Sequence, residues 1–252
     1  MYAGFKLEAL KFKNFTSSIS TQERRLTKKK EIESRLKEYV VDNTTVNATE
    51  IQNDWFPQVK ANVFLSHSHA DIESVTLLAD FLEEKFGLNC FIDSYVWGYF
   101  NNLINLLLEG EELTIENVSY VSSNVHMMLS MALNNMIDRC ECIIFYNTPN
   151  SLSLKGLIQQ TTSPWIYNEL TVSKIIRKRS KIAHRLLLLE NFSTGIIKTA
   201  KAVKKKFFYD VNLSHLHNMS VKQFNDWRKA VLNQNIKGIT SLDCLYNLYE
   251  IS

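Results

Sequence analysis

Apolar and polar positions follow two different periods along this chain. From residue 62 onward, nearly continuous apolar runs alternate with stretches in which apolar residues recur every three or four positions. The continuous runs are typical of strands buried on both faces, and the helical spacing is typical of amphipathic helices that cover such strands. The expected strands are 62–66, 89–93, 141–146, 182–189 and 207–211.

Strands that alternate with helices in this way predict an α/β fold, with a five-stranded parallel sheet and helices on both of its faces. Gly87 is expected to end the first helix in a left-handed conformation. Right-handed crossovers place the carboxyl ends of all parallel strands at one edge of the sheet, where such folds bind ligands. The expected helices are 72–86, 123–138, 164–179, 193–205 and 220–233.

Three regions differ in their pattern. Residues 1–60 are polar and partly helical, and Ser20–Glu23 is typical of a capping box at a helix start. We therefore expect an N-terminal helical extension and linker over 1–60. The α/β domain is expected over 61–235, with an insertion near 101–124, and residues 236–252 are expected to form a tail packed on that domain.

Composition narrows the class of protein further. Hydrophobic residues make up 45% of the 252 positions, enough for a sizeable core, and 29 Lys and Arg against 26 Asp and Glu give a charge of +3, which predicts no nucleic-acid partner. The apolar runs are too short for a membrane span, and no signal sequence precedes the domain. The cysteines make neither a CxxC pair nor a disulfide framework. We expect a soluble, cytoplasmic protein without nucleic-acid or membrane partners.

Several familiar ligand loops are missing from the sequence. The chain has 7 Gly and contains neither GxGxxG, GxxxxGK[ST] nor GxSxG. Rossmann-type and P-loop nucleotide sites and the serine hydrolase elbow are therefore excluded. The candidate residues instead lie in segments that directly follow expected strands, or that begin an expected helix.

The first such segment, 66–71, reads Ser-His-Ser-His-Ala-Asp. Its HxHxD pattern is most of the metallo-β-lactamase motif HxHxDH, and two imidazoles with a carboxylate could hold zinc. Ile72 stands at the final position of that motif, however. The alternatives are that Asp71 caps the next helix beside exposed histidines, or that the loop contacts a ligand without a metal.

The second segment, 93–100, is dense in aromatic residues. Asp93 follows the expected strand, and Trp97 and Tyr99 flank Gly98. Such a loop could stack on a flat ligand ring, could dock on a partner, or could simply pack beneath the insertion that follows.

The third segment begins the helix expected at 164–179. Ser163 can cap it, and Pro164 suits its first turn. Trp165 and Glu169 are four positions apart and therefore share one face near the helix N-terminus. A carboxylate beside a large ring could bind ribose hydroxyls and stabilise positive charge; alternatively, it could complement the helix dipole while the Trp anchors the helix.

Together these segments resemble bacterial TIR (Toll/interleukin-1 receptor) domains. Residues 63–68 are similar to the opening strand and loop of that family, and 90–98 resemble its second strand and mobile loop. Residues 163–170 resemble the motif S-x-W-C-x-x-E-L of its third helix, with Ile166 where Cys is usual. The resemblance covers about 60–233 and implies a flavodoxin-like sheet.

The family includes signalling scaffolds and enzymes that cleave NAD, and the enzymes require a Glu at the position of Glu169. The resemblance therefore implies an NAD glycohydrolase or cyclase that releases nicotinamide and makes an ADP-ribose or cyclic ADP-ribose signal, as in Thoeris-like antiphage defence. NAD is then a substrate, and neither a cofactor nor a metal is expected. Residues expected to line the site around Glu169 are Ser66, His67, Ser68, Asp93, Trp97 and Trp165.

The same resemblance implies self-association through the loop around Trp97 and a separate effector protein that senses the product. Two alternatives stay open. The chain could be a non-catalytic interaction module that docks through that loop, or a metal-dependent hydrolase that uses His67, His69 and Asp71.

Overall fold

The computed structural model describes most of the chain, and three long segments, 24–60, 93–103 and 188–208, lie outside it. Described are residues 1–10, 15–19, 21, 23, 61–92, 104, 105, 107, 108, 110, 112–155, 158–187 and 209–251. The loop 93–100, with Asp93 and Trp97, lies outside the described residues. So do Ser20 of the expected capping box and the helix expected at 193–205.

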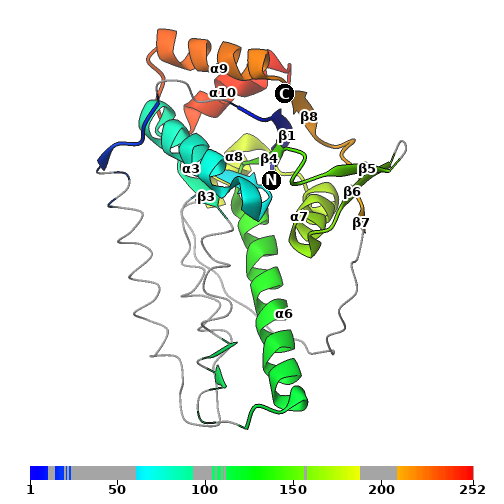
Figure 1. Cartoon of the computed structure of the whole chain (residues 1–252). Helices are drawn as coiled ribbons and strands as arrows, with labels where there is room; N and C mark the ends of the chain where they lie inside the picture. Colours follow the sequence, from blue (N-terminus) through cyan, green and yellow to red (C-terminus); the bar gives the residue numbers. More distant parts are fainter. Residues whose placement is uncertain are drawn as a thin grey trace.

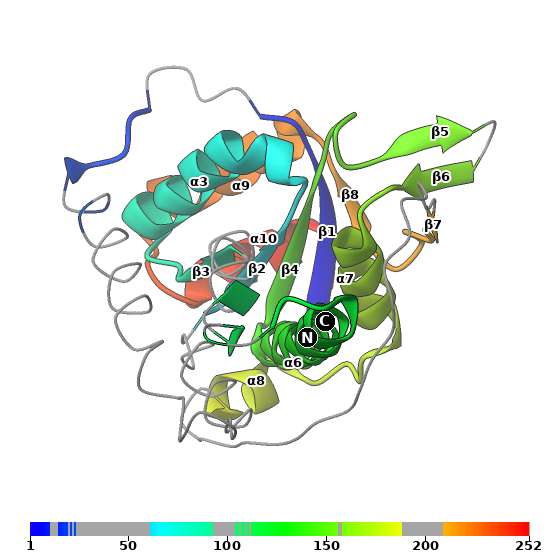
Figure 2. The same ribbon diagram turned by 60° about the horizontal axis from the view of Figure 1, so that its bottom comes forward.

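The centre of the molecule is a five-stranded sheet in which every pair of neighbours is parallel. This confirms the predicted α/β class with a parallel five-stranded sheet. The strand order is β3-β2-β4-β1-β8, and Figure 2 shows the strands between two layers of helices. The strands are β1 (Ala3–Glu8), β2 (Val63–Ser66), β3 (Cys90–Ile92), β4 (Cys142–Asn147) and β8 (His217–Met219).

Strands β2, β3 and β4 come from the expected runs, but the other two predicted strands were wrong. The run expected at 182–189 contains the helix α8 (Lys181–Leu187) instead. Its apolar residues Ile182 and Leu186 lie exposed on one side of α8. A short apolar run does not by itself distinguish a strand from a helix, and this explains the error.

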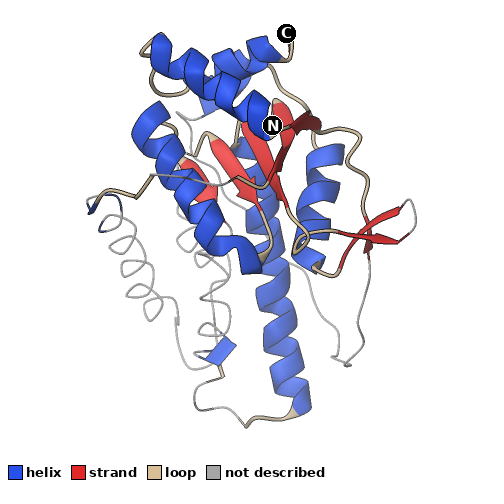
Figure 3. Ribbon diagram, turned by 45° about the horizontal axis from the view of Figure 1, so that its top comes forward, coloured by secondary structure: helices blue, strands red, loops and turns tan. Residues whose placement is uncertain are grey.

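The run expected at 207–211 supplies a strand of a different sheet. Its described part forms β7 (Tyr209–Asp210), which pairs antiparallel with β6 (Ile158–Thr161). β6 also pairs antiparallel with β5 (Ser153–Lys155). This small sheet lies beside α7 (Pro164–Ile175), as Figure 3 shows.

The N-terminal residues, assigned from sequence to a helical extension, form a strand within the main sheet. β1 pairs with β4 on one side and β8 on the other, the place that the fourth strand holds in the flavodoxin-like order 2-1-3-4-5. Its alternate residues Ala3, Phe5 and Leu7 are buried on one face. Gly4 faces the other, where a Cβ would lie 2.6 Å from Leu216 Cδ2. Lys6 and Glu8 interrupt the apolar residues, so this strand does not coincide with a continuous apolar run.

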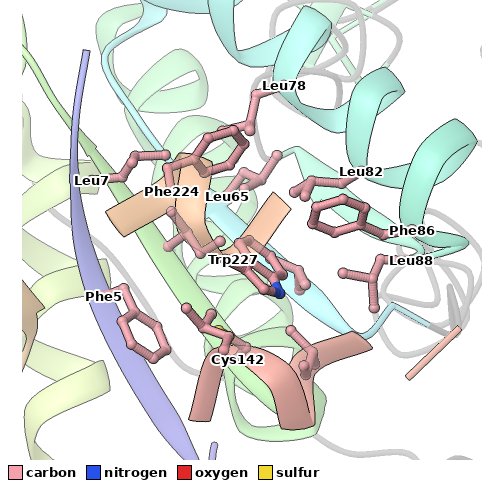
Figure 4. Close-up of a cluster of buried hydrophobic side chains, with 14 of the residues drawn as sticks. Phe5, Leu7, Leu65, Leu78, Leu82, Phe86, Leu88, Cys142, Phe224 and Trp227 are labelled. Carbon is pink, nitrogen blue, oxygen red and sulfur yellow. The ribbon is translucent and has the colours of Figure 1, made fainter. Parts of the chain in front are cut away.

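One face of the sheet is covered by α3 (Ile72–Phe81), α9 (Val221–Asn233) and α10 (Thr240–Leu248). Trp227 of α9 is fully buried there among apolar side chains (Figure 4). Its Nε1 donates to Ser241 O at 2.8 Å. The helix α3 continues as a π-helical turn, η3 (Leu82–Phe86), and ends at Gly87 with φ 68°, which confirms the left-handed position expected for that glycine.

The opposite face is covered by α6 (Ile115–Arg139) and α7. α6 has 25 residues, and all of its buried side chains lie between 125 and 137. Its N-terminal part therefore extends past the sheet (Figure 1). Part of the expected insertion, 115–124, belongs to this helix. Among the described residues no helix, α6 included, has the length and apolar character needed to cross a membrane.

An ion-pair cluster holds α8 against the start of β4 and against α10. The guanidinium of Arg185 contacts Glu141 Oε2 at 3.1 Å and Asp243 Oδ1 at 3.0 Å. Glu141 is almost fully buried, so Arg185 supplies the countercharge that a buried carboxylate requires. This cluster places His184, the neighbouring residue on α8, in a fully buried position.

Replacing Phe5 tests the position of β1 in the sheet. Phe5→Ala should lower the free energy of unfolding by about 3–5 kcal/mol, because it leaves a cavity between the sheet and the aromatic residues of α10. Glu8→Ala, at an exposed position of the same strand, should change it by less than about 0.5 kcal/mol. Urea unfolding measures both, and equal effects would contradict this topology.

Burial of His184 predicts a dependence of stability on pH. Burial lowers its pKa from 6.5 to about 4, so the unfolded chain binds a proton in this interval that the folded chain does not. Stability should therefore be greatest above pH 6.5 and fall towards pH 4, by roughly 3 kcal/mol from this group. His215 and His217, whose pKa values are also lowered by burial, act in the same direction.

Urea unfolding at pH 7, 5.5 and 4.5 tests this dependence in the wild type and in His184→Gln. Glutamine does not titrate, so the variant should lose clearly less stability over the interval than the wild type does. Parallel pH profiles would show that His184 contributes nothing to the slope.

Candidate functional site

The carboxyl ends of β2 and β4 form the point where ligands are expected in such a sheet. The two strands are hydrogen-bonded neighbours, but the chain leaves them towards opposite faces. β2 leads into α3 on one face, and β4 leads through β5 and β6 into α7 on the other. Open α/β sheets bind ligands at such a switch point, outside the strand ends.

A buried contact between Ser66 and Glu169 lies at this point. Ser66 is the last residue of β2, and its Oγ donates to Glu169 Oε2 at 2.5 Å. Both side chains are 0% exposed. A carboxylate removed from water in this way depends on hydrogen bonds to its oxygens, and Ser66 supplies one of them.

The start of α7 positions Glu169. Ser163 is the N-cap, and its Oγ accepts from Ile166 N at 3.3 Å, while Pro164 occupies the first turn. Both features were expected from the sequence. Ile166 is buried in the core and orients the helix so that Glu169, on the second turn, faces the end of β2.

The loop after Ser66 is held by hydrogen bonds to its own backbone. His67 is buried, and its Nδ1 donates to Leu65 O at 3.2 Å. Ser68 caps the short 3₁₀ turn η2 (His69–Asp71), where its Oγ accepts from Ala70 N. The loop therefore has a fixed conformation between the strand and α3.

Asp71 occupies the N-cap position of α3, but its side chain does not cap the helix. Its carboxylate instead accepts from Thr148 Oγ1 at 2.5 Å and from Asn150 Nδ2 at 2.8 Å. These residues follow β4, so Asp71 joins the loops after the two central strands across the switch point. The alternative in which Asp71 caps the next helix is therefore wrong. No pattern in the sequence indicates that Thr148 and Asn150 belong to the site.

Trp165 lies half-buried one turn before Glu169, as their spacing predicts. Its ring stacks on His126 of α6, with ring centroids 5.7 Å apart and an angle of 7° between the planes. His126 is exposed, and its Nδ1 donates to Ser122 O at 2.8 Å. The role of His126 beside Trp165 was missed from sequence, because the two residues belong to different helices.

The three residues of the zinc-like motif do not converge. His67 is buried, His69 is exposed, and the Asp71 carboxylate is engaged by Thr148 and Asn150. Over the part of the chain that the structure describes, no group of three or more His, Cys, Asp or Glu side chains could hold a metal ion.

Of the residues expected at the site, the structure brings Ser66 and Glu169 into direct contact and places Trp165 on the same helix face. His67 and Ser68 belong to the loop that directly follows Ser66. Asp93 and Trp97 lie outside the described residues, although Asp93 follows the last residue of β3.

Comparisons with known proteins identify no family for this chain. No family model, no curated protein and no solved structure matches the chain.

Replacing Asp71 tests whether its carboxylate holds the two loops together. Asp71→Ala should lower the free energy of unfolding by about 1–3 kcal/mol, because Thr148 and Asn150 lose their acceptor. His69→Ala, in the same turn but exposed, serves as the control and should change stability by less than about 0.5 kcal/mol. The two variants are compared by urea unfolding, and an Asp71 effect no larger than the control would contradict the bridging role.

Proposed function

We propose that this protein is a TIR-type enzyme that cleaves NAD between nicotinamide and ribose, with Glu169 as its catalytic carboxylate. The observation that carries the proposal is the buried carboxylate of Glu169, hydrogen-bonded to Ser66 at the switch point of a parallel sheet.

The reaction needs negative charge more than it needs a proton donor. The nicotinamide nitrogen of NAD is cationic, so the C1′–N bond can break with its electron pair moving to that nitrogen. Positive charge then develops on the ribose, and water adds to C1′ with loss of a proton to give ADP-ribose. In a cyclase an adenine nitrogen of the same molecule takes the place of water.

Glu169 would stabilise the positive charge on the ribose. Two unit charges about 4 Å apart attract by about 4 kcal/mol at an effective dielectric constant of about 20. That energy corresponds to roughly a thousandfold in rate, which is comparable to the effect of a single well-placed electrostatic group. One carboxylate would therefore supply part of the rate enhancement, and the positioning of the substrate has to supply the rest.

The substrate reaches Glu169 only after a neighbouring side chain moves, because the carboxylate is fully buried in this conformation. We propose that the side chain that moves is His126, which stacks on Trp165 and lies at the surface. Trp165 would then offer its ring to a flat base of NAD. His67 and Ser68, with Asp93 and Trp97 of the adjacent loop, are proposed to complete the pocket.

The proposed product is an ADP-ribose or cyclic ADP-ribose signal, sensed by a separate effector protein in antiphage defence. Self-association through the loop around Trp97 is part of the same proposal.

Replacing Glu169 with Gln tests the function. Gln keeps the size of the side chain and an acceptor for Ser66, but removes the charge. NAD turnover should fall by at least ~100-fold, with little change in thermal stability. Glu116→Gln, an exposed acidic position on α6, is the matched control and should keep full activity.

Nicotinamide release is followed by mass analysis, with purified protein alone and after addition of phage-infected lysate. Unchanged turnover in Glu169→Gln, or a wild type that leaves NAD intact under both conditions, would end the proposal.

A further inference from the structure

Ser66 was expected to contact the substrate, but its hydroxyl proton is already engaged. A serine hydroxyl has one proton to donate, and Ser66 Oγ directs it to Glu169 Oε2 at 2.5 Å. While this contact lasts, Ser66 can accept a hydrogen bond from a ligand but cannot donate one. A substrate hydroxyl would have to displace this buried contact before Ser66 could donate to it.

The donor itself is held rigidly. Ser66 belongs to the parallel ladder between β2 and β4, in register with Phe145, and is fully buried. The loop that follows it is fixed at its other end, where Asp71 accepts from Thr148 and Asn150. A group can orient its neighbour only when its own position is determined by such supports.

The carboxylate of Glu169 keeps one position only where contacts restrict the rotation of its side chain. Three rotatable bonds separate its carboxylate from the backbone of α7, and a displacement of about 1 Å at a reacting group can lower a rate by about a hundredfold. A hydrogen bond from the end of β2 restricts this rotation and keeps the negative charge at one place at the switch point.

From this geometry we infer that Ser66 is the positioning residue for Glu169 and acts on catalysis only through that carboxylate. The inference rests on the proposed NAD cleavage and specifies how its catalytic group is held. It replaces the expected substrate contact of Ser66 with an orienting role.

A double-mutant cycle separates the two roles. The variants are Ser66→Ala, Glu169→Gln and the combination of both, with kcat and KM for NAD measured for each. In the wild-type background, Ser66→Ala should lower kcat by about 10- to 100-fold and leave KM within about twofold. In the Glu169→Gln background the same change should cause no further loss, because the carboxylate that Ser66 orients is gone.

Conservative replacements control for a purely structural effect. Ser66→Thr keeps the hydroxyl donor and should restore kcat to within about threefold of the wild type, whereas Ser66→Cys, a weak donor of similar size, should fall between Thr and Ala. Thermal unfolding of each variant identifies any that does not fold. If Ser66→Ala fails to fold, Ser66→Cys takes its place in the cycle.

Two results would overturn the inference while leaving NAD cleavage intact. One is an equal loss of kcat on replacing Ser66 in both backgrounds, and the other is a rise in KM alone; each would assign Ser66 a direct contact with substrate. A wild type without NAD cleavage would instead overturn the proposed function, and the positioning role would fall with it.

Discussion

Strand β4 forms backbone ladders with β1 on one side and β2 on the other, and the arrangement of the molecule depends on these two ladders. The pairing with β1 runs over six residues, from Ala3↔Cys142 to Glu8↔Asn147. The pairing with β2 runs over four and ends at Ser66↔Phe145. Because both ladders are parallel, all three strands end at the same edge, and the apolar residues of β4 alternate between the two cores. The helices on both faces pack on this framework.

The ladder also determines where polar side chains can meet. It brings the loop after β2 beside the loop after β4, so that Asp71 can bridge to Thr148 and Asn150. It also places Ser66 where a helix from the opposite face can bring Glu169 within hydrogen-bond distance. The candidate site is thus built on strand ends and one helix rather than on free loops, and such supports hold a charged group in one position.

Part of the fold could be predicted because it follows from local periodicity. The continuous apolar runs of β2, β3 and β4 indicated buried strands, and the parallel α/β class followed from their alternation with helices. The strand β1 escaped prediction because its apolar residues alternate with Gly and charged residues. The run around α8 was misread because a short apolar run fits either a strand or a helix. The ion pairs of Arg185 with Glu141 and Asp243, which hold this helix in place, form only in the folded chain.

For the site, the local features could be predicted from the amino-acid pattern: the cap at Ser163, the first-turn Pro164, and the shared face of Trp165 and Glu169. These follow from helix geometry over one or two turns. The hydrogen bond from Ser66 to Glu169 could not be predicted in this way, because 103 positions separate the two residues along the chain. No periodicity encodes a contact at that distance. It forms because the sheet edge and the helix N-terminus are brought together when the two cores pack on opposite faces of β4.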